Sequence, residues 1–580
     1  MEAFLGVSSS LSGRPWAGPD EALRRAAEAI AQAHGLPLPL AGLLARSQVP
    51  AEEVAAYLEP KLRDLLPDPL QLRDMGAAAA RVNRAVEAGE RIAIFADYDV
   101  DGAASAALLL LWLRALGRQA TLYIPDRIDE GYGPNVPAMA RLAAAHDLII
   151  CVDCGTLSHE PVAAAEGADV VILDHHLGGE TLPDAAAVVN PNRQDETGDL
   201  GHLCAAGVVF LMLVEARRQR REAGLAPGAE LMGLLDLVAL ATVADVAPLI
   251  GVNRAFVRTG LQVMARRERP GLAALADVAG VATAPTDYHL GFVLGPRINA
   301  GGRVGRADLG ARLLTTEDPA EAASLADRLN ELNRERREIE AAVRAAALAQ
   351  AEARGLEAPL AWAAGEGWHP GVVGIVAARL KEAADRPAVV IGFEGDEGKG
   401  SARSVPGVDI GAAMQRLAAE GLIARGGGHR MAAGLTLSRA QLEPAMARLG
   451  ELMAAQGSGS FGPRALRLDG LVLPPAATPE LVTRLTAAGP FGASAPAPRF
   501  ALPDCRILDA RQVGDGHLKL TFGDGTARLG AIGFGQVETP LGAALLGHQG
   551  RRFHLAGRLE LNHWQGRTSA QLMLDDAAPA

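Results

Sequence analysis

Short apolar runs alternate with helical segments from residue 91 onward, and this alternation constrains the fold more than any other feature. The apolar runs are RIAIFA (91–96), DLIICV (147–152), DVVIL (169–173) and AAVVN (186–190), and helical segments such as AASAALLLLWLRALG (103–117) separate them. Strands separated by helices at this spacing are typical of a parallel, doubly wound sheet. The sequence therefore predicts an α/β domain here.

The rest of the 580-residue chain is too long to share one core with this domain. Residues 200–265 have an all-helical pattern, and a second α/β pattern follows a long amphipathic segment that starts at Asp318-Pro319 and runs to about Arg354. Runs near the C-terminus, such as HLKLTF, alternate apolar with polar residues, which predicts a small antiparallel barrel or sandwich. We expect a helical N-terminal segment (1–85), an α/β domain (86–315), a connecting helix (316–356), a smaller α/β domain (357–456) and a β domain (457–580).

Composition narrows the class of protein. The chain has no uninterrupted apolar stretch of membrane-spanning length and no basic-then-apolar N-terminus, so we expect a cytoplasmic protein without a membrane segment. Its net charge of −12 makes a polyanionic partner less expected, although such binding depends on local basic surface. Four cysteines are too few for a disulfide framework, and we expect the CxxC pair Cys151 and Cys154 to be buried thiols rather than zinc ligands.

Three aspartates lie at alternate positions in FADYDVDG, at the end of the first apolar run: Asp97, Asp99 and Asp101. Three like charges this close together repel one another, so they are tolerated only where water or a cation neutralises them. A calcium loop of the EF-hand type would need a glutamate at its twelfth position, where this chain has Leu108. An aspartyl phosphatase nucleophile and a solvated acidic turn stay open for this motif taken alone.

Further acidic and imidazole side chains follow the later strands. Asp153 ends one apolar run, Asp174-His175-His176 ends another, and Asp245 lies near a helix end in ATVADVAPL. Ligands gather at the carboxyl ends of parallel strands, so we expect these groups to converge with the first three aspartates in one crevice. Such a cluster is tenable with two divalent cations, manganese in preference to magnesium, and would form a catalytic centre for phosphate-ester hydrolysis.

The motifs DYDVDG, VDCGT, DHH and ADVAPL resemble, in this order, the four motifs of the DHH phosphoesterase superfamily. The segments IPDRIDEGYGPN, CAAGVVF, GPRINAGGRVGRA, WHPGVVGIVAARL, GKGSARS and GGGHRMAAGL are similar to those of its RecJ family, over roughly residues 90 to 575. The resemblance implies a DHH catalytic domain, a connecting helix, a DHH-associated domain and a C-terminal OB-fold. It also implies a 5′→3′ exonuclease that digests single-stranded DNA to mononucleotides in recombination and repair.

By the same resemblance, most of the converging groups are metal ligands. The implied ligands are Asp97, Asp99, Asp101, Asp153, His175 and Asp245. Asp153 is expected to bridge the two ions, His176 to contact the scissile phosphate, and Asp174 to orient an imidazole.

A second set of residues is expected to hold DNA. Ser401 and Arg403 in GKGSARS, and the glycine-rich RGGGHR, offer donors suited to phosphate. The full set of candidates is Arg127, Tyr132, Arg297, Asn299, Arg303, Arg306, Ser401, Arg403, Gly427, Gly428 and His429. In the β domain the weaker candidates for guiding the strand are His517, Lys519, Arg551, Arg552 and Trp564.

Two other functions compete with this interpretation. A DHH phosphodiesterase for short oligonucleotides or cyclic dinucleotides would share the two-lobed core but would not need the β domain. A non-catalytic replication scaffold would require eroded ligands, whereas the acidic motifs are intact here. The expected partners are single-stranded DNA with a 5′ end, a single-strand-binding protein and a RecQ-type helicase, with the chain itself a monomer.

Overall fold

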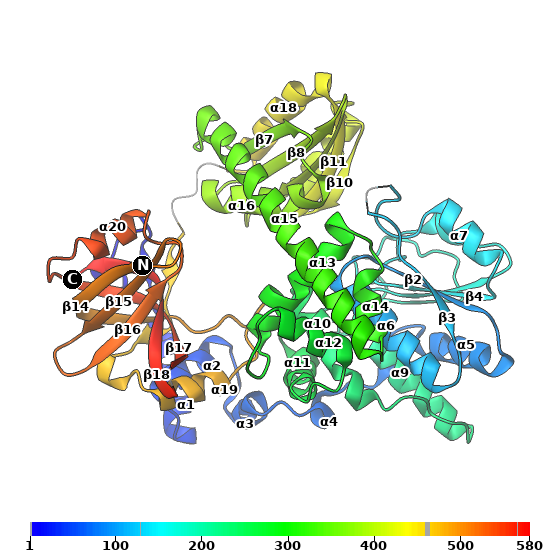
Figure 1. The fold of residues 1–580 in the computed structure, drawn as a ribbon, viewed down its shortest axis with the longest axis horizontal. Helices are drawn as coiled ribbons and strands as arrows, with labels where there is room; N and C mark the ends of the chain where they lie inside the picture. The colour runs from blue at the N-terminus through cyan, green and yellow to red at the C-terminus, as the bar shows by residue number, and fades with distance from the viewer. Residues whose placement is uncertain (1–2, 128, 459–463, 565) are drawn as a thin grey trace. The chain divides into compact units, whose positions relative to one another are not determined.

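The structure is a computed structural model that describes residues 3–127, 129–458, 464–564 and 566–580. It divides into two compact units, one formed by residues 66–461 and the other by residues 1–65 together with 462–580 (Figure 1). No helix among the described residues is long and apolar enough to cross a membrane.

A five-stranded parallel sheet forms the centre of the first half of the larger unit. Its order is β3 (Ala120–Tyr123), β2 (Ile92–Ala96), β4 (Leu148–Val152), β5 (Asp169–Leu173) and β6 (Ala187–Val189). Helices α7 (Val136–Ala143) and α8 (His159–Ala163) pack on the face that carries Phe95 and Ile149. Helices α5 (Met75–Ala88), α6 (Val100–Ala115) and α9 (Ala205–Glu222) also contact the strands, so the predicted doubly wound sheet is confirmed.

Helices follow the sheet, as the pattern over residues 200–265 predicts. They are α9, α10 (Leu235–Ala244), α11 (Gly251–Met264), α12 (Pro270–Val278), a π-helix (His289–Leu294), α13 (Gly295–Val304) and α14 (Leu309–Thr315). The long α15 (Pro319–Arg354) begins where the Asp318 carboxylate accepts a hydrogen bond from the Ala320 N–H at 2.9 Å. This 36-residue helix confirms the predicted connector.

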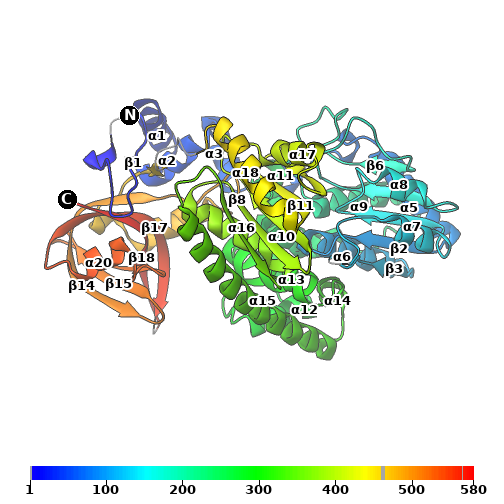
Figure 2. The same ribbon diagram turned by 90° about the horizontal axis from the view of Figure 1, so that it is seen from above.

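The second half of the larger unit has a mixed sheet. Its order is β10 (Arg425–His429), β11 (Ala432–Ser438), β9 (Glu397–Arg403), β8 (Ala388–Glu394) and β7 (Ala361–Glu366), and only β7 and β8 are parallel. Helix α16 (Pro370–Ala384) packs between this sheet and α15. Helices α17 (Ile410–Ala419) and α18 (Leu442–Ala455) cover the other face, as Figure 2 shows.

The smaller unit is built around a closed barrel. Its strands follow the order β14 (Phe500–Val513), β15 (His517–Gly523), β16 (Arg528–Gly533), β18 (Arg567–Pro579) and β17 (Arg552–Trp564), and β17 pairs again with β14. The C-terminal part of this unit also contains helices α19 (Pro479–Ala487) and α20 (Pro540–Leu546). This closure confirms the predicted OB-fold-like barrel.

The N-terminal residues share the core of this barrel. Helices α1 (Glu21–His34) and α2 (Leu38–Arg46) contribute Ile30, Leu43 and Leu44 to the same apolar cluster as barrel strands, and the short β1 (Trp16–Ala17) pairs with β12 (Leu466–Arg467). The short α3 (Val54–Leu58) and α4 (Leu62–Leu65) end this part. Helix α5 runs across the predicted boundary at residue 85, because it packs with α9 beside the parallel sheet. The predicted domain boundaries stay predictions.

Candidate metal centre

The acidic loop lies between the end of β2 and the start of α6. The Asp99 carboxylate caps this helix by accepting hydrogen bonds from the N–H groups of Asp101 at 2.9 Å and Gly102 at 3.1 Å. A Cβ atom on Gly102 would lie 2.3 Å from the Asp97 carbonyl oxygen. The loop can therefore turn this tightly only with glycine at position 102, and the turn holds the three aspartates close together.

Asp101 is held by a second helix. Its two carboxylate oxygens accept hydrogen bonds from the Ala205 N–H at 2.7 Å and the Ala206 N–H at 2.8 Å, at the N-terminus of α9. The positive end of that helix stabilises a negative charge on Asp101. The segment CAAGVVF therefore contributes backbone groups that fix the orientation of this carboxylate.

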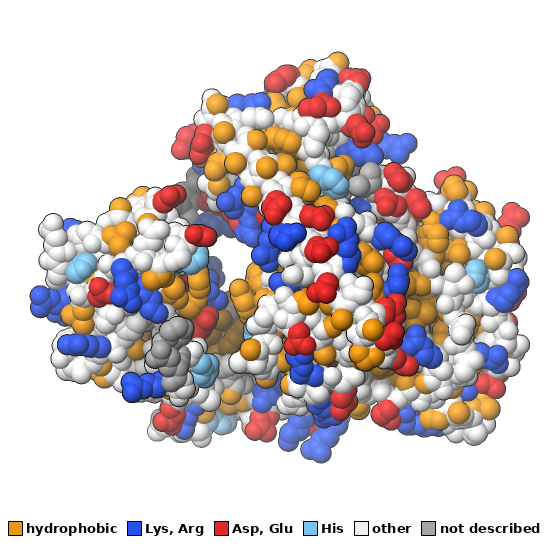
Figure 3. Space-filling model, in the orientation of Figure 1, with side chains coloured by type: hydrophobic (Ala, Val, Ile, Leu, Met, Phe, Trp, Pro, Cys, Tyr) orange, Lys and Arg blue, Asp and Glu red, His pale blue; other side chains and the backbone are white. Residues whose placement is uncertain are grey.

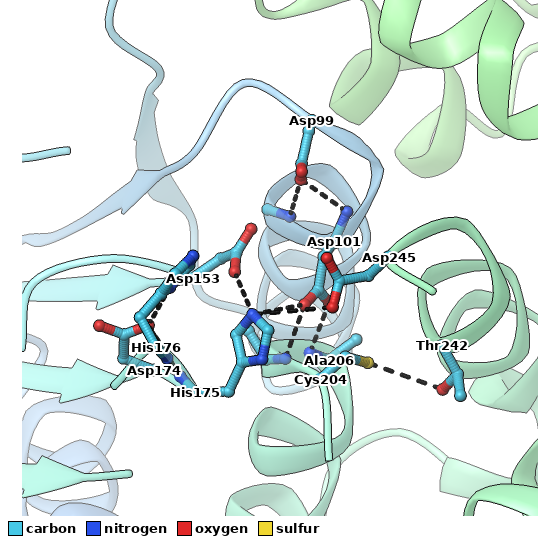
Figure 4. A network of polar contacts seen from close by, with 12 residues as sticks. Asp99, Asp101, Asp153, Asp174, His175, His176, Cys204, Ala206, Thr242 and Asp245 are labelled. Carbon is cyan, nitrogen blue, oxygen red and sulfur yellow. Dashed lines mark hydrogen bonds and ion pairs between the residues drawn. The ribbon is translucent and has the colours of Figure 1, made fainter. Parts of the chain in front are cut away.

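Asp153 and Asp245 approach the loop from two other elements. Asp153 follows β4 in the left-handed region, with φ of 61°. This conformation costs a non-glycine residue on the order of 1 kcal/mol. Asp245 lies at the C-terminal end of α10. The His175 Nε2 atom lies 3.2 Å from Asp153 Oδ1, 3.7 Å from Asp101 Oδ2 and 3.8 Å from Asp245 Oδ2 (Figure 4).

The donor atoms form three overlapping groups, each with atoms within 4.8 Å of one another. The groups are Asp97, Asp99 and Asp153; Asp101, His175 and Asp245; and Asp153, His175 and His176. Within the described residues, Asp97 Oδ1, Asp153 Oδ1 and His175 Nε2 are buried and make no hydrogen bond of normal geometry, although the last two lie 3.2 Å apart. Buried polar atoms are normally paired, so this donor set fits metal ions that would occupy these atoms.

The carboxylates of the cluster carry like charges that repel one another. Burial, together with the neighbouring carboxylates, raises the pKa of Asp97 and of Asp153 well above its ordinary value. Burial also raises the pKa of Asp101, and it raises that of Asp245 to about 8. Without a cation, the cluster therefore favours protonated carboxyl groups at neutral pH, and a bound cation would favour the ionised forms.

Asp174 does not face the other carboxylates but orients the histidines. One of its oxygens accepts from the Thr156 N–H and hydroxyl at 3.0 and 2.7 Å, and the other lies 2.8 Å from His176 Nδ1. Although burial opposes both charges, this contact lowers the pKa of Asp174 and raises the pKa of His176 to about 9. The Tyr132 hydroxyl, 3.1 Å from His176, donates to the Asp153 carbonyl at 3.2 Å.

Arg127 lies within electrostatic range of two other candidate phosphate ligands, Arg303 and Arg403. Arg127 lies over the Tyr98 ring, with 4.7 Å between the guanidinium carbon and the ring centre. Burial and the charge of Arg127 lower the pKa of Arg303, to about 10, and that of Arg403. The Arg403 guanidinium also donates to the Ser401 hydroxyl at 2.9 Å. Arginines whose charges repel one another form a site for an anion.

Other candidates are held elsewhere. Arg297 donates to Asn330 on α15, and Arg306 is paired with the adjacent Asp308, so neither side chain is directed at the acidic cluster. Asn299 instead accepts from the Val100 N–H at 3.1 Å and so supports the acidic loop. Sequence alone cannot tell which face of a helix such residues occupy.

The remaining candidate DNA-binding residues lie on the glycine-rich strand β10 and in the barrel of the smaller unit. Nothing lies within 4 Å of a Cβ placed on Gly427, whereas one on Gly428 would lie 2.4 Å from the Ala432 carbonyl, and His429 is exposed. In the barrel, His517 accepts from the Gly535 N–H and Arg552 pairs with Asp504. Lys519 is half-buried and Arg551 exposed, while the side chain of Trp564 lies outside the described part of the chain.

Sequence reasoning missed two asparagines that support the histidines. Asn190 Nδ2 donates to the His176 carbonyl at 2.8 Å, and Asn192 Nδ2 donates to the His175 carbonyl at 2.6 Å. Asn190 also donates to the Thr156 hydroxyl, which links the VDCGT and DHH segments. The signal for them was the segment NPN (190–192) directly after strand β6, at the same end of the sheet as the acidic residues.

Three family models match the chain in order. The DHH family N-terminal domain matches residues 91–242, the DHHA1 domain 357–455 and the RecJ OB domain 468–576. The single-stranded-DNA-specific exonuclease RecJ of Dickeya dadantii is 38% identical over 90% of this chain and 93% of its own length. The chain belongs to the RecJ family. The RecJ proteins of Escherichia coli and Bacillus subtilis are 37% and 34% identical, over 93% and 68% of their own lengths and 90% and 94% of this chain.

Solved RecJ structures share the fold. RecJ of Thermus thermophilus in complex with Mn²⁺ matches with a TM-score of 0.80 and 30% identity, over 97% of this chain and 79% of that one. The same protein in complex with Mg²⁺ matches with a TM-score of 0.75 and 29% identity, over 97% and 78%. Both neighbours hold one of the two metals that the sequence predicts for this cluster.

Proposed function

We propose that this chain is a metal-dependent exonuclease that hydrolyses single-stranded DNA from its 5′ end to 5′-mononucleotides in recombination and repair. Relatives that match nearly their whole length carry the name single-stranded-DNA-specific exonuclease. The observation that carries the proposal is the set of buried atoms without a hydrogen bond on Asp97, Asp153 and His175, gathered at the carboxyl ends of parallel strands.

We assign to the cluster two divalent ions, manganese in preference to magnesium. Asp97, Asp99, Asp101, Asp153, His175 and Asp245 are the proposed ligands. Asp153 is the proposed bridge, because it and His175 each belong to two of the three donor groups, and only a carboxylate offers two oxygens that could each bind an ion. Divalent ions held by these residues would supply an activated water for hydrolysis and would stabilise negative charge on the phosphoryl oxygens. Burial shields Asp97, Asp101 and Asp153 from bulk water, whereas Asp99, His175 and Asp245 are half-buried.

The remaining side chains would hold the DNA. His176, which Asp174 orients and keeps positively charged, is positioned to contact the scissile phosphate. Arg127, Arg303 and Arg403 with Ser401 would hold neighbouring phosphate oxygens. We infer that Tyr132, half-exposed with its hydroxyl turned inward, limits the space beside the cluster. A duplex is then excluded by its width.

The test is a digestion assay with Mn²⁺ on four substrates. They are 5′-labelled and 3′-labelled single-stranded DNA, duplex DNA and a dinucleotide. The proposal predicts release of labelled mononucleotide first from the 5′-labelled single strand, and almost no product from the duplex. Asp153→Asn should abolish activity, whereas Asp327→Asn, at an exposed aspartate on α15, should not. A preference for the dinucleotide over the long strand would instead indicate a small-substrate phosphodiesterase.

We also propose that the partners of this chain are a single-strand-binding protein and a RecQ-type helicase, and that the chain is monomeric and cytoplasmic. Its proposed domain boundaries lie at residues 85, 315, 356 and 456. The barrel of the smaller unit supports binding of the single strand outside the larger unit, because barrels of this type bind such strands through basic and aromatic side chains.

A further inference from the structure

A pocket of about 240 Å³ lies between α13 and α15, in the larger unit. Its lining is Arg297 from α13 and Asn330, Glu331, Asn333, Arg334 and Arg337 from α15. Four of the α15 residues, at positions 330, 333, 334 and 337, follow the spacing i, i+3, i+4 and i+7, so they lie on one face of the helix. Over α15, Figure 3 shows basic side chains interspersed with acidic ones.

The pocket is lined almost entirely by hydrogen-bond donors. Asn330 Oδ1 accepts from Arg297 Nε at 3.0 Å, and Asn333 Oδ1 accepts from Arg336 Nη2 at 2.7 Å. With both amide oxygens in use, the two asparagines offer their NH₂ groups. Glu331 is paired with Arg328 at 3.1 Å. Donors without acceptors suit an anion with several oxygens.

Two arginines that line the pocket, Arg297 and Arg337, have no acidic partner among the described residues, whereas Arg334 lies 4.0 Å from Glu338. Arg297 is 9% exposed, and its bonds go to an amide oxygen and to the Val293 carbonyl, not to a carboxylate. Within the described ranges, Arg337 is exposed and has no ion pair. Burial and the charge of Arg337 lower the pKa of Arg297. An anion in the pocket would relieve this repulsion.

Helix α13 links the pocket to the acidic loop. Arg297 lines the pocket, and Asn299, two residues later on the same helix, accepts a hydrogen bond from the Val100 N–H beside that loop. Arg303, half-buried further along α13, has its pKa lowered by burial and by the charges of Arg127 and Arg336. Arg336 itself is paired with Glu340 at 2.7 Å and donates to Asn333 in the pocket lining.

We propose that the pocket between α13 and α15 binds a backbone phosphate of the single strand whose end lies at the metal centre. This site is separate from the phosphate contacts of Ser401 and Arg403, and it rests on the proposed function. A phosphodiester group has the required oxygens, and α13, which carries Arg297 of the pocket and Asn299 beside the acidic loop, connects the pocket with the metal centre. The pocket would read no base, so it would bind strands of any sequence.

The test compares Arg337→Ala with Arg337→Lys and with Arg344→Ala, at an exposed arginine on the same helix outside the pocket. Affinity for a fluorescent oligonucleotide of about 20 nucleotides is measured over a range of salt concentrations. For single strands the slope of log K against log salt changes by about 0.7 for each phosphate contact. We expect Arg337→Ala to weaken binding several-fold and to make this slope shallower by about that amount. Arg337→Lys should keep most of the slope, and Arg344→Ala should match the parent.

Two results would overturn the proposal. One is an Arg337→Ala slope equal to that of the parent or of Arg344→Ala. The other is thermal stabilisation by inorganic phosphate that Arg337→Ala abolishes without any change in oligonucleotide binding, because the pocket would then hold free phosphate and not a strand. Binding by anisotropy requires no turnover, so a parent chain that binds with the expected slope but digests nothing would refute the nuclease and leave the pocket supported.

Discussion

Asp153 combines two local costs that a folded protein does not ordinarily retain together. Its backbone lies in the left-handed region, and its buried carboxylate has an oxygen without a hydrogen bond. Each cost is on the order of 1–3 kcal/mol. A pair of bound cations would account for both costs. The cations would bind the oxygen that lacks a hydrogen bond, and the left-handed backbone would place the carboxylate beside them.

The raised carboxyl pKa values predict how metal and pH act on stability. The folded metal-free protein retains protons that the unfolded chain releases above about pH 4, so its stability should fall as pH rises towards about 8, the pKa of Asp245. Mn²⁺ displaces these protons, so the stabilisation it gives should grow over the same range. Melting temperatures with and without Mn²⁺ between about pH 5.5 and 8.5 measure this. A Mn²⁺ effect that is constant with pH would contradict it.

Asp174→Asn should act through His176. Because Asp174 raises the pKa of that imidazole, its loss lowers the pKa, and the imidazolium is then depleted at a lower pH. We expect kcat to fall by about 10–100-fold and the alkaline limb of its pH profile to move to lower pH, with manganese still bound. A kcat loss with an unshifted profile would indicate a purely structural role for Asp174.

At the scale of elements, local signals determined what could be predicted. The 36-residue α15 was evident because its cap, its first-turn proline and its apolar spacing are all local. The acidic residues could be brought together because parallel strands place their carboxyl ends on one edge. Arg297 could not be placed, since the partner of a helix face, here Asn330, is set by packing between distant segments.

Gly102→Ala tests the junction of β2 and α6. The new methyl group would collide with the Asp97 backbone, which can move only by displacing the carboxylates that follow. We expect a loss of stability of about 1–3 kcal/mol and a larger loss of manganese affinity than of stability. Denaturant unfolding and manganese titration measure the two. Gly450→Ala, at a glycine of α18 with open space around its Cβ position, controls for the change in backbone freedom. Full manganese affinity in Gly102→Ala would contradict the account.

At the scale of the whole molecule, the chain ends belong to one unit. Trp16, 1% exposed, donates from its indole Nε1 to Asp576 at 3.0 Å, and the N-terminal helices complete the core of the barrel. Sequence patterns could not show this, because β1 (Trp16–Ala17) and β12 (Leu466–Arg467) are two residues each and lie far apart in the sequence. The pairing depends on long-range contacts that leave no local signal.

Trp16→Ala should therefore destabilise the smaller unit alone. Removing this side chain and leaving Asp576 buried should cost about 3–5 kcal/mol. Two transitions should then separate in thermal unfolding, with the Mn²⁺-dependent one unchanged. Trp362→Ala, in the larger unit, is the matched control and should leave the smaller unit's transition in place. A shift of the Mn²⁺-dependent transition in Trp16→Ala would contradict the independence of the two units.

The central claim is that acidic side chains from separate segments are held together by two cations. Anomalous diffraction at the manganese edge, from crystals grown with Mn²⁺ near pH 8, tests it most directly, because the carboxyl groups are then readily ionised. The account predicts two peaks about 3.5–4 Å apart, both within bonding distance of Asp153. Ordered carboxylates with no anomalous peak among them, at saturating Mn²⁺, would contradict it.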